Sequence, residues 1–177
     1  MWYFLQGLVP ALALAGAELP ETMAYSRSFL FAPPACEYRV LFPQFPQRIG
    51  TLVENPTIWS AQLQLPDAFM RADCRPVNES IPLTESNTTE ANARRLNSFL
   101  YEQILKFGGP NLVVLNLEIG KNHAKMTAQL FMESESVLLK TNAYIGEYSM
   151  LTLTAIEHDR VRSGTAAERF MHHIGRP

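Results

Sequence analysis

The second half of the chain contains four consecutive segments with the residue pattern of β-strands. They cover residues 111–119, 124–132, 137–145 and 148–156. The connections GKNH, ESES and GE are each short enough for a hairpin. The pattern therefore predicts a four-stranded antiparallel meander. In its last strand Thr152 and Thr154 alternate with apolar residues, so one face of that strand is expected to be partly wet.

The first half of the chain contains shorter alternating segments. Residues 36–42 place cysteine, tyrosine, valine and phenylalanine on one side of a predicted strand, which ends at the proline-containing sequence PQFPQRIG. Segments 57–65 and 68–74 alternate in the same way on either side of the turn dipeptide PD, which predicts a hairpin. Residues 18–35 contain paired prolines and are predicted to form an extended arm.

Two segments have the residue spacing of amphipathic helices. The first follows Asn87, a candidate N-cap with Glu90 three residues later, and its apolar stripe runs from Leu96 to Phe107. Its neighbouring arginines and lysine fall on the side expected to face water. The sequence GGP at 108–110 predicts the end of this helix, because proline cannot continue it. The second predicted helix is AAERFMHHI, with Thr165 as its N-cap.

The order of these elements is strands, helix, four strands, helix. This order predicts an α+β fold, in which the N-terminal strands and the C-terminal meander form an antiparallel sheet. We expect both helices to pack on one face of that sheet. No internal repeat or linker divides the segment, so residues 18–177 are predicted to form a single domain.

The first 17 residues are predicted to be a signal peptide. The sequence MWYFLQGLVPALALAGA has no charged side chain, and its end, Ala15-Gly16-Ala17, matches the small-residue pattern of a cleavage site. A positively charged n-region is missing, so three other interpretations stay open: an uncleaved membrane anchor, a buried N-terminal helix and a wrongly assigned start. With cleavage after Ala17, the protein is expected to be periplasmic or secreted.

The composition is that of an ordinary globular protein. Hydrophobic residues make up 47% of the chain, charged residues make up 18%, and the formal net charge is −2. Proteins that bind nucleic acid need a basic patch or stripe, and the sequence contains no such run. Nucleic acid is therefore not an expected partner.

Cys36 and Cys74 are the two cysteines of the chain. In an exported protein such a pair usually forms a disulfide, whereas in a cytosolic protein two buried free thiols are the usual outcome. A catalytic thiol is disfavoured, because the sequence ties no histidine, lysine or arginine cluster to either cysteine. Closing a loop of this size would stabilise the fold by about 4 kcal/mol on the chain-entropy model. We predict a Cys36–Cys74 disulfide.

Candidate catalytic and metal-binding residues are few. The four histidines show no metal-ligand spacing, so neither a metal site nor a cofactor is predicted. The sequence TLTAIEHDR groups Glu157, His158 and Asp159, which could serve general acid–base catalysis. Three polar residues after a strand are more often a loop, and no nucleophile motif accompanies them. No catalytic residue is therefore assigned.

The last 70 or so residues resemble a known family. Tyr144 and Gly146 at a hairpin turn, Leu151 and Leu153 in the following strand, and Phe170 in the terminal helix form the matching pattern. This pattern resembles small exported bacterial proteins of the PsbP/Mog1-like type. The resemblance implies an α/β/α sandwich and a role in binding or assembly, and it transfers no active site.

Taken together, the sequence predicts an exported, non-enzymatic binding or assembly factor stabilised by one disulfide. Its partner would be a protein or a small ligand. The alternative is a small hydrolase or ligand-binding domain whose site is assembled from dispersed residues, with Arg71 among the candidates. That alternative requires a concave pocket lined by polar groups from several elements. A third possibility is a domain tethered by an uncleaved N-terminal anchor.

Overall fold

The computed structural model describes residues 28–52, 57–77, 89–107, 109–133, 135–158 and 165–175. The predicted signal peptide, the predicted N-cap Asn87 and Asp159 of the polar cluster lie outside these residues. Within the described part of the chain, no helix is long and apolar enough to span a bilayer.

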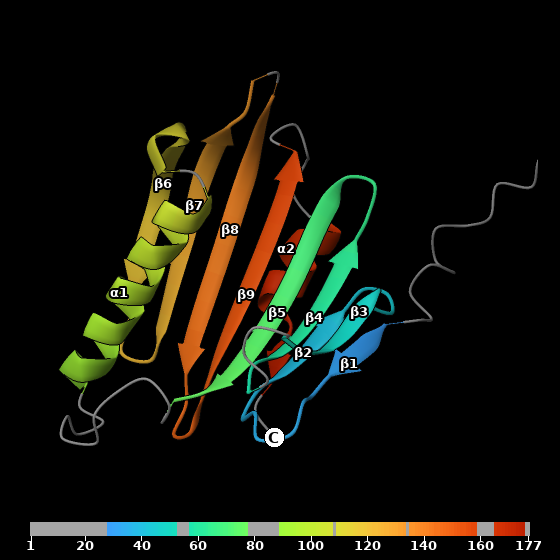
Figure 1. Cartoon of the computed structure of the whole chain (residues 1–177), viewed down its shortest axis with the longest axis vertical. Coiled ribbons are helices and arrows are strands. Elements are labelled where there is room, and N and C mark those ends of the chain that lie inside the picture. The colour runs from blue at the N-terminus through green and yellow to red at the C-terminus, as the bar shows by residue number, and fades with distance from the viewer. Residues whose placement is uncertain are drawn as a thin grey trace, which may run out of the picture.

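A seven-stranded antiparallel sheet forms the middle layer of the molecule (Figure 1). Its strands, in spatial order, are β3 (Arg48–Thr51), β4 (Trp59–Gln64), β5 (Ala68–Pro76), β9 (Ser149–His158), β8 (Ser136–Ile145), β7 (His123–Phe131) and β6 (Leu112–Ile119). The predicted meander corresponds to β6 through β9 and the predicted hairpin to β4 and β5. The α+β prediction is confirmed.

Pairing between β5 and β9 joins the two halves of the chain into one sheet. Its register runs from Ala68 opposite Glu157 to Pro76 opposite Ser149. A second, three-stranded sheet has the order β1 (Phe29–Phe31), β2 (Arg39–Phe42) and β10 (Ile174–Gly175). Three strands of four residues or fewer, β1, β3 and β10, were not predicted, because alternation over so few residues gives no periodic signal.

The helices are α1 (Thr89–Phe107) and α2 (Ala166–His172), and a short 3₁₀ turn, Gly109–Asn111, follows α1. α1 ends where the GGP sequence predicted. α2 begins after Thr165, whose hydroxyl accepts the N–H of Glu168 at 3.0 Å, which confirms the predicted cap. α2 is shorter than predicted, because Ile174 belongs to β10.

The prediction that both helices share one face of the sheet is wrong. The buried cluster around α1 includes Met150, and the cluster around α2 includes Leu151. Because consecutive side chains of a strand point to opposite faces, the two clusters lie on opposite sides of the sheet. Figure 1 shows α1 in front of the β6–β8 half and α2, with the small sheet, behind the other half.

This arrangement leaves the central strand β9 buried on both faces. Thr152 and Thr154, expected to be partly wet, are only 6% and 4% exposed. Both threonines lie on the same face of β9 as Met150, and this is the face that carries α1. Threonine is small and β-branched, so it fits a buried position in a central strand. The alternation of polar and apolar residues does not show whether a second layer covers the threonine face.

Candidate functional site

The Cys36–Cys74 disulfide is present, with the two Cα atoms 6.1 Å apart. Cys74 lies in β5 of the large sheet, and Cys36 lies in the segment that leads into β2 of the small sheet. The bond therefore ties the two sheets together. It leaves no free cysteine, so neither residue is available as a nucleophile or metal ligand in this state.

Glu37, beside the disulfide, binds the turn between β8 and β9. Its carboxylate accepts the backbone N–H groups of Glu147, Tyr148 and Ser149, each at 2.9 Å. A Cβ added to Gly146 would come within 1.9 Å of Glu37 Oε2, so this approach requires glycine there. Burial raises the pKa of Glu37, but the three backbone bonds and the Ser149 hydroxyl outweigh it and hold that pKa below 4.5.

The predicted polar cluster is divided between the two faces of β9. Glu157 is 4% exposed, forms an ion pair with Lys140 and accepts the Thr165 hydroxyl at 3.0 Å, so it anchors the cap of α2. His158 points to the other face, where it is exposed and lies 3.3 Å from Glu135. Glu157 and His158 therefore do not face one another. Among the described residues, no group of three metal-ligating side chains occurs.

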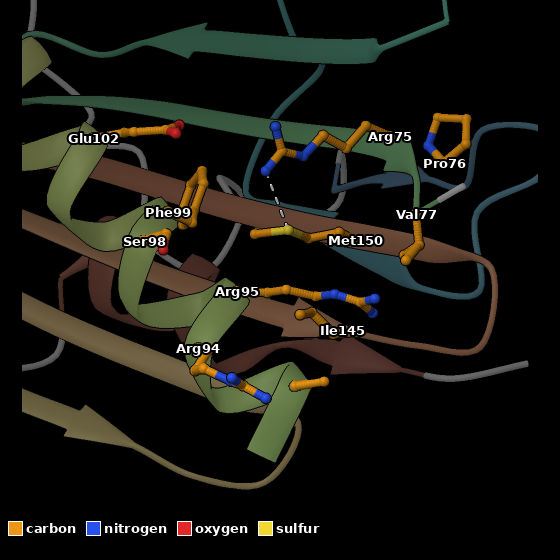
Figure 2. A pocket seen from close by; sticks show the side chains of 11 residues that line it. Arg75, Pro76, Val77, Arg94, Arg95, Ser98, Phe99, Glu102, Ile145 and Met150 are labelled. Atoms are coloured by element: carbon orange, nitrogen blue, oxygen red, sulfur yellow. Dashed lines mark hydrogen bonds between the residues drawn. The ribbon is translucent and has the colours of Figure 1, made fainter. Parts of the chain in front are cut away.

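A pocket lies between α1 and the sheet, on the α1 face (Figure 2). It has a volume of about 560 Å³. β5 and the residue after it, α1, β8 and β9 contribute its walls. The lining residues are Arg75, Pro76, Val77, Ala91, Arg94, Arg95, Ser98, Phe99, Glu102, Ile145 and Met150. We call this the arginine pocket.

Three guanidinium groups reach the pocket from two sides. Figure 2 shows Arg75 extending from β5, and Arg94 and Arg95 extending from α1. Arg75 Nη2 lies 3.3 Å from Met150 Sδ, and its guanidinium carbon is 5.3 Å from the centre of the Phe99 ring. A thioether sulfur is a weak acceptor, so within the described residues most of the hydrogen-bonding capacity of Arg75 is not used by a strong acceptor.

Arg95 also has unused donors. Its Nη1 lies at 3.4 Å from Asn92 Oδ1, a long hydrogen bond, and its Nε is buried without a hydrogen-bond partner in the described structure. Buried polar groups are nearly always hydrogen-bonded, so an unpaired buried Nε is unusual. Arg95 is one of the residues that line the pocket. Sequence reasoning placed Arg95 on the wet side of the helix, whereas it is half-buried in the pocket wall.

The pocket is electropositive although the whole chain is slightly acidic. The lining residues include three arginines and one carboxylate, Glu102, whose charge acts on Arg75. Burial lowers the pKa of Arg75, while the charges of Glu102 and Asp73 raise it. Arginine nevertheless stays protonated at neutral pH. Arg71 pairs instead with Asp73 at 2.7 Å and lies outside this pocket.

The remaining walls are apolar. Val77, Ile145 and Met150 extend beside the arginines, with Phe99 between them and the helix (Figure 2). A pocket that combines guanidinium donors with an apolar wall suits a molecule that has an anionic head and an apolar body. The adjacent arginines Arg94 and Arg95 are visible in the sequence as a candidate anion-binding pair. Only the fold shows that Arg75 lines the same pocket.

No protein-family model matches this chain, and no curated protein matches it either. Among solved structures, it is similar to PA94 from Pseudomonas aeruginosa, whose title describes a protein of unknown function. The two share 11% sequence identity over 75% of this chain and 84% of that chain, with a TM-score of 0.39. A likeness this weak does not establish a common fold, so the site itself has to indicate the function.

Proposed function

We propose that the chain is an exported, non-enzymatic binding protein whose arginine pocket holds the anionic group of a small organic ligand. The observation that carries the proposal is the convergence of Arg75, Arg94 and Arg95 on one pocket. The Cys36–Cys74 disulfide supports export, because such bonds persist mainly in oxidising compartments.

The chemistry of the pocket narrows the ligand class. A guanidinium presents paired N–H donors that match the two oxygens of a carboxylate or phosphate. The apolar side chains of Val77, Ile145 and Met150 would then cover a hydrocarbon or aromatic portion of the same molecule. We therefore expect an amphipathic organic acid or phosphate monoester to bind more tightly than inorganic phosphate.

Binding suits this pocket better than catalysis does. Catalytic nucleophiles are activated by a base within hydrogen-bonding distance. Ser98 and Glu102 supply a hydroxyl and a carboxylate to the lining, but both are exposed on α1 and no hydrogen bond joins them in the described structure. The alternative of a small hydrolase therefore lacks an activated group at this site.

The resemblance to PsbP/Mog1-like proteins is part of the proposal. It implies a binding or assembly role and a sheet covered on both faces. Helices on opposite faces of the sheet support this layering. The function proposed here does not depend on the resemblance, because the arginine pocket is observed directly.

Calorimetric titration of the oxidised chain with octanoate, octanamide and inorganic phosphate tests the proposal. We expect octanoate to bind and octanamide, which lacks the charge, to bind at least about tenfold more weakly, since each tenfold step corresponds to roughly 1.4 kcal/mol. Arg75→Met and Arg95→Met should each weaken octanoate binding by a similar factor. Arg39→Met, at an exposed position of β2, is the matched control and should have no effect.

Two outcomes would contradict the pocket assignment. One is equal affinity for octanoate and octanamide, and the other is equal loss of binding in the Arg39 variant and the pocket variants. N-terminal sequencing of protein from its native host tests export separately. A mature chain that begins at Glu18 supports secretion, an intact Met1 in the membrane fraction favours the anchor, and an intact chain in the cytosol contradicts export.

A further inference from the structure

The edge strand β6 differs from every other long strand of the sheet in its exposure. Seven of its eight residues are exposed, although its sequence is LVVLNLEI. Val114 is 39% exposed and Leu117 is 47% exposed. A long, apolar edge strand is a template for pairing with another strand, and proteins normally protect such edges with lysine, proline, a β-bulge or a covering segment. Within the described structure, β6 pairs with β7 alone.

The opposite edge of the same sheet is protected. β3 has only four residues, RIGT, and carries a charge at Arg48 and a glycine at position 50. Short edge strands and charged side chains are ordinary ways of preventing edge pairing. β3 is exposed as well, so what distinguishes the β6 edge is that its exposed strand is long and mainly apolar.

A β-bulge makes the order of apolar residues on one face of β6 symmetric about the middle of the strand. The pairing with β7 shifts between Val114 and Asn116, which makes Leu115 the extra residue. As a result, four apolar residues lie on one face of β6, the face that carries α1. They are Leu112, Val114, Leu117 and Ile119. Without the bulge, the two halves of this set would point to opposite faces.

This symmetry is what a two-fold axis requires. If β6 pairs antiparallel with β6 of a second copy about the strand midpoint, Leu112 lies opposite Ile119, and Val114 lies opposite Leu117. Each apolar residue on the α1 face then meets an apolar residue on the same face of the other copy. A two-fold interface uses one patch of surface twice, so this self-complementarity favours a second copy over an unrelated strand.

The charge on β6 is compatible with the same register. Glu118 is the one ionised residue of the strand, and on its own sheet it lies 3.0 Å from His123 and 3.8 Å from Lys125. Antiparallel pairing about the midpoint places Glu118 opposite Val113. The two Glu118 residues are then roughly 17 Å apart at about 3.4 Å per residue. That separation exceeds the screening length of about 8 Å at physiological ionic strength.

The apolar surface extends onto α1, which packs on β6 and β7. Tyr101 and Leu105 of α1 are 61% and 59% exposed, and Leu115 is 55% exposed. These side chains add to the apolar surface that β6 exposes, and large exposed apolar patches mark interaction sites.

We infer that the chain forms a two-fold dimer through antiparallel pairing of β6 with β6 of a second copy, so that two seven-stranded sheets become one continuous sheet. This inference does not rest on the proposed ligand, because no residue of β6 lines the arginine pocket. The pocket and the β6 edge can therefore be tested independently.

Sedimentation velocity of the oxidised chain across a range of concentrations tests the inference. We expect a dimer for the wild type. Leu117→Lys places a charge opposite Val114 of the other copy and should raise the dimer dissociation constant at least about a hundredfold, because burying an unpaired charge is strongly unfavourable. Val114→Glu should have the same effect. The double variant Val114→Glu, Leu117→Lys should restore the dimer, because each glutamate then faces a lysine.

Ile49→Lys on β3 is the matched control, since Ile49 is 42% exposed on the opposite edge of the same sheet. It should remain dimeric. Circular dichroism of each variant establishes that it is folded before its mass is interpreted. A wild type that is monomeric at high concentration would overturn the inference and leave the edge for a strand of another protein. Failure of the double variant to restore association, while folded, would overturn the proposed register.

Discussion

The two halves of the large sheet are covered on opposite faces and are held by different interactions. The half formed by β3, β4 and β5 is joined to the small sheet by the Cys36–Cys74 disulfide. Glu37, next to this disulfide, binds the β8–β9 turn at the end of the large sheet. The half formed by β6, β7 and β8 is covered by α1 through apolar side chains such as Leu96, Leu100 and Met126. That second half also contains the exposed edge and borders the arginine pocket.

This difference indicates that the region around Cys36 and Glu37 mainly stabilises the fold, whereas the region around α1 is mainly available for binding. Covalent and charge-assisted bonds concentrate around Cys36 and Glu37, where a loss should lower the free energy of unfolding. Around α1, the half-buried Arg75 and Arg95 make only weak or long hydrogen bonds within the described residues, and several apolar residues are exposed. Such groups add little to stability and are available for a ligand or partner. The two regions should therefore respond differently to substitution.

Removal of the disulfide should have the largest effect on stability. In the double variant Cys36→Ala, Cys74→Ala, the free energy of unfolding should fall by about 4 kcal/mol, because the unfolded chain regains the entropy of an open loop. Urea unfolding monitored by tryptophan fluorescence measures this change in the free energy of unfolding. A loss below about 1 kcal/mol would show that the bond adds little to this half and would remove the proposed contrast.

Gly146→Ala should have the next largest effect, with a loss of about 2 kcal/mol from overpacking. The new methyl group would collide with the Glu37 carboxylate, which would have to leave the turn. The same substitution in a Glu37→Ala background should be nearly neutral, because the collision is gone. Equal losses in both backgrounds, measured as a double-mutant cycle, would show that Glu37 is not the reason for glycine at this position.

Glu37→Gln should lower the free energy of unfolding by about 1 kcal/mol at neutral pH, since it removes the charge from three hydrogen bonds to the turn. Because the folded-state pKa of Glu37 is depressed, its contribution is fully present above the unfolded-state pKa. The contribution is lost as the pH falls through the folded-state pKa. Melting temperatures of the two proteins should therefore converge in acid, and a constant difference at all pH values would contradict this assignment.

Arg95→Met should have the smallest effect on stability, within about 0.5 kcal/mol of the wild type, because among the described residues its buried Nε has no partner and its Nη1 makes only a long hydrogen bond to Asn92. The same variant is expected to bind octanoate more weakly. Stability from urea unfolding and affinity from calorimetry therefore separate the two roles. A loss of stability above about 1 kcal/mol would place Arg95 among the structural residues instead.

Several features of the fold could be predicted from local patterns. The hairpin turns and alternation between residues 111 and 156 predicted four paired strands, and the cap at Thr165 predicted the start of α2. Such features depend on residues close together in the sequence. The disulfide was also predicted, since the chain offers each cysteine only one possible mate.

The candidate binding residues could not be predicted in this way. Arg75 and Arg95 meet because β5 pairs with β9, which brings α1 and β5 to the same pocket from distant parts of the chain. The role of Glu37 depends on a turn 110 residues later. Neither arrangement leaves a periodic signal in the sequence. Helical spacing predicts only that Arg95 lies off the apolar stripe of α1, and for this reason it was expected to face water.

The sequence by itself determined which of the longer segments form strands and helices, where their hairpins turn and which cysteines join, because these follow from local patterns and from the number of cysteines. Only the tertiary structure decided that α1 and α2 cover opposite faces, that Thr152 and Thr154 are buried, and that β6 remains exposed. Burial depends on which layers meet after strands distant in sequence have paired. Alternation identifies the two faces of a strand, but it does not say what covers each face.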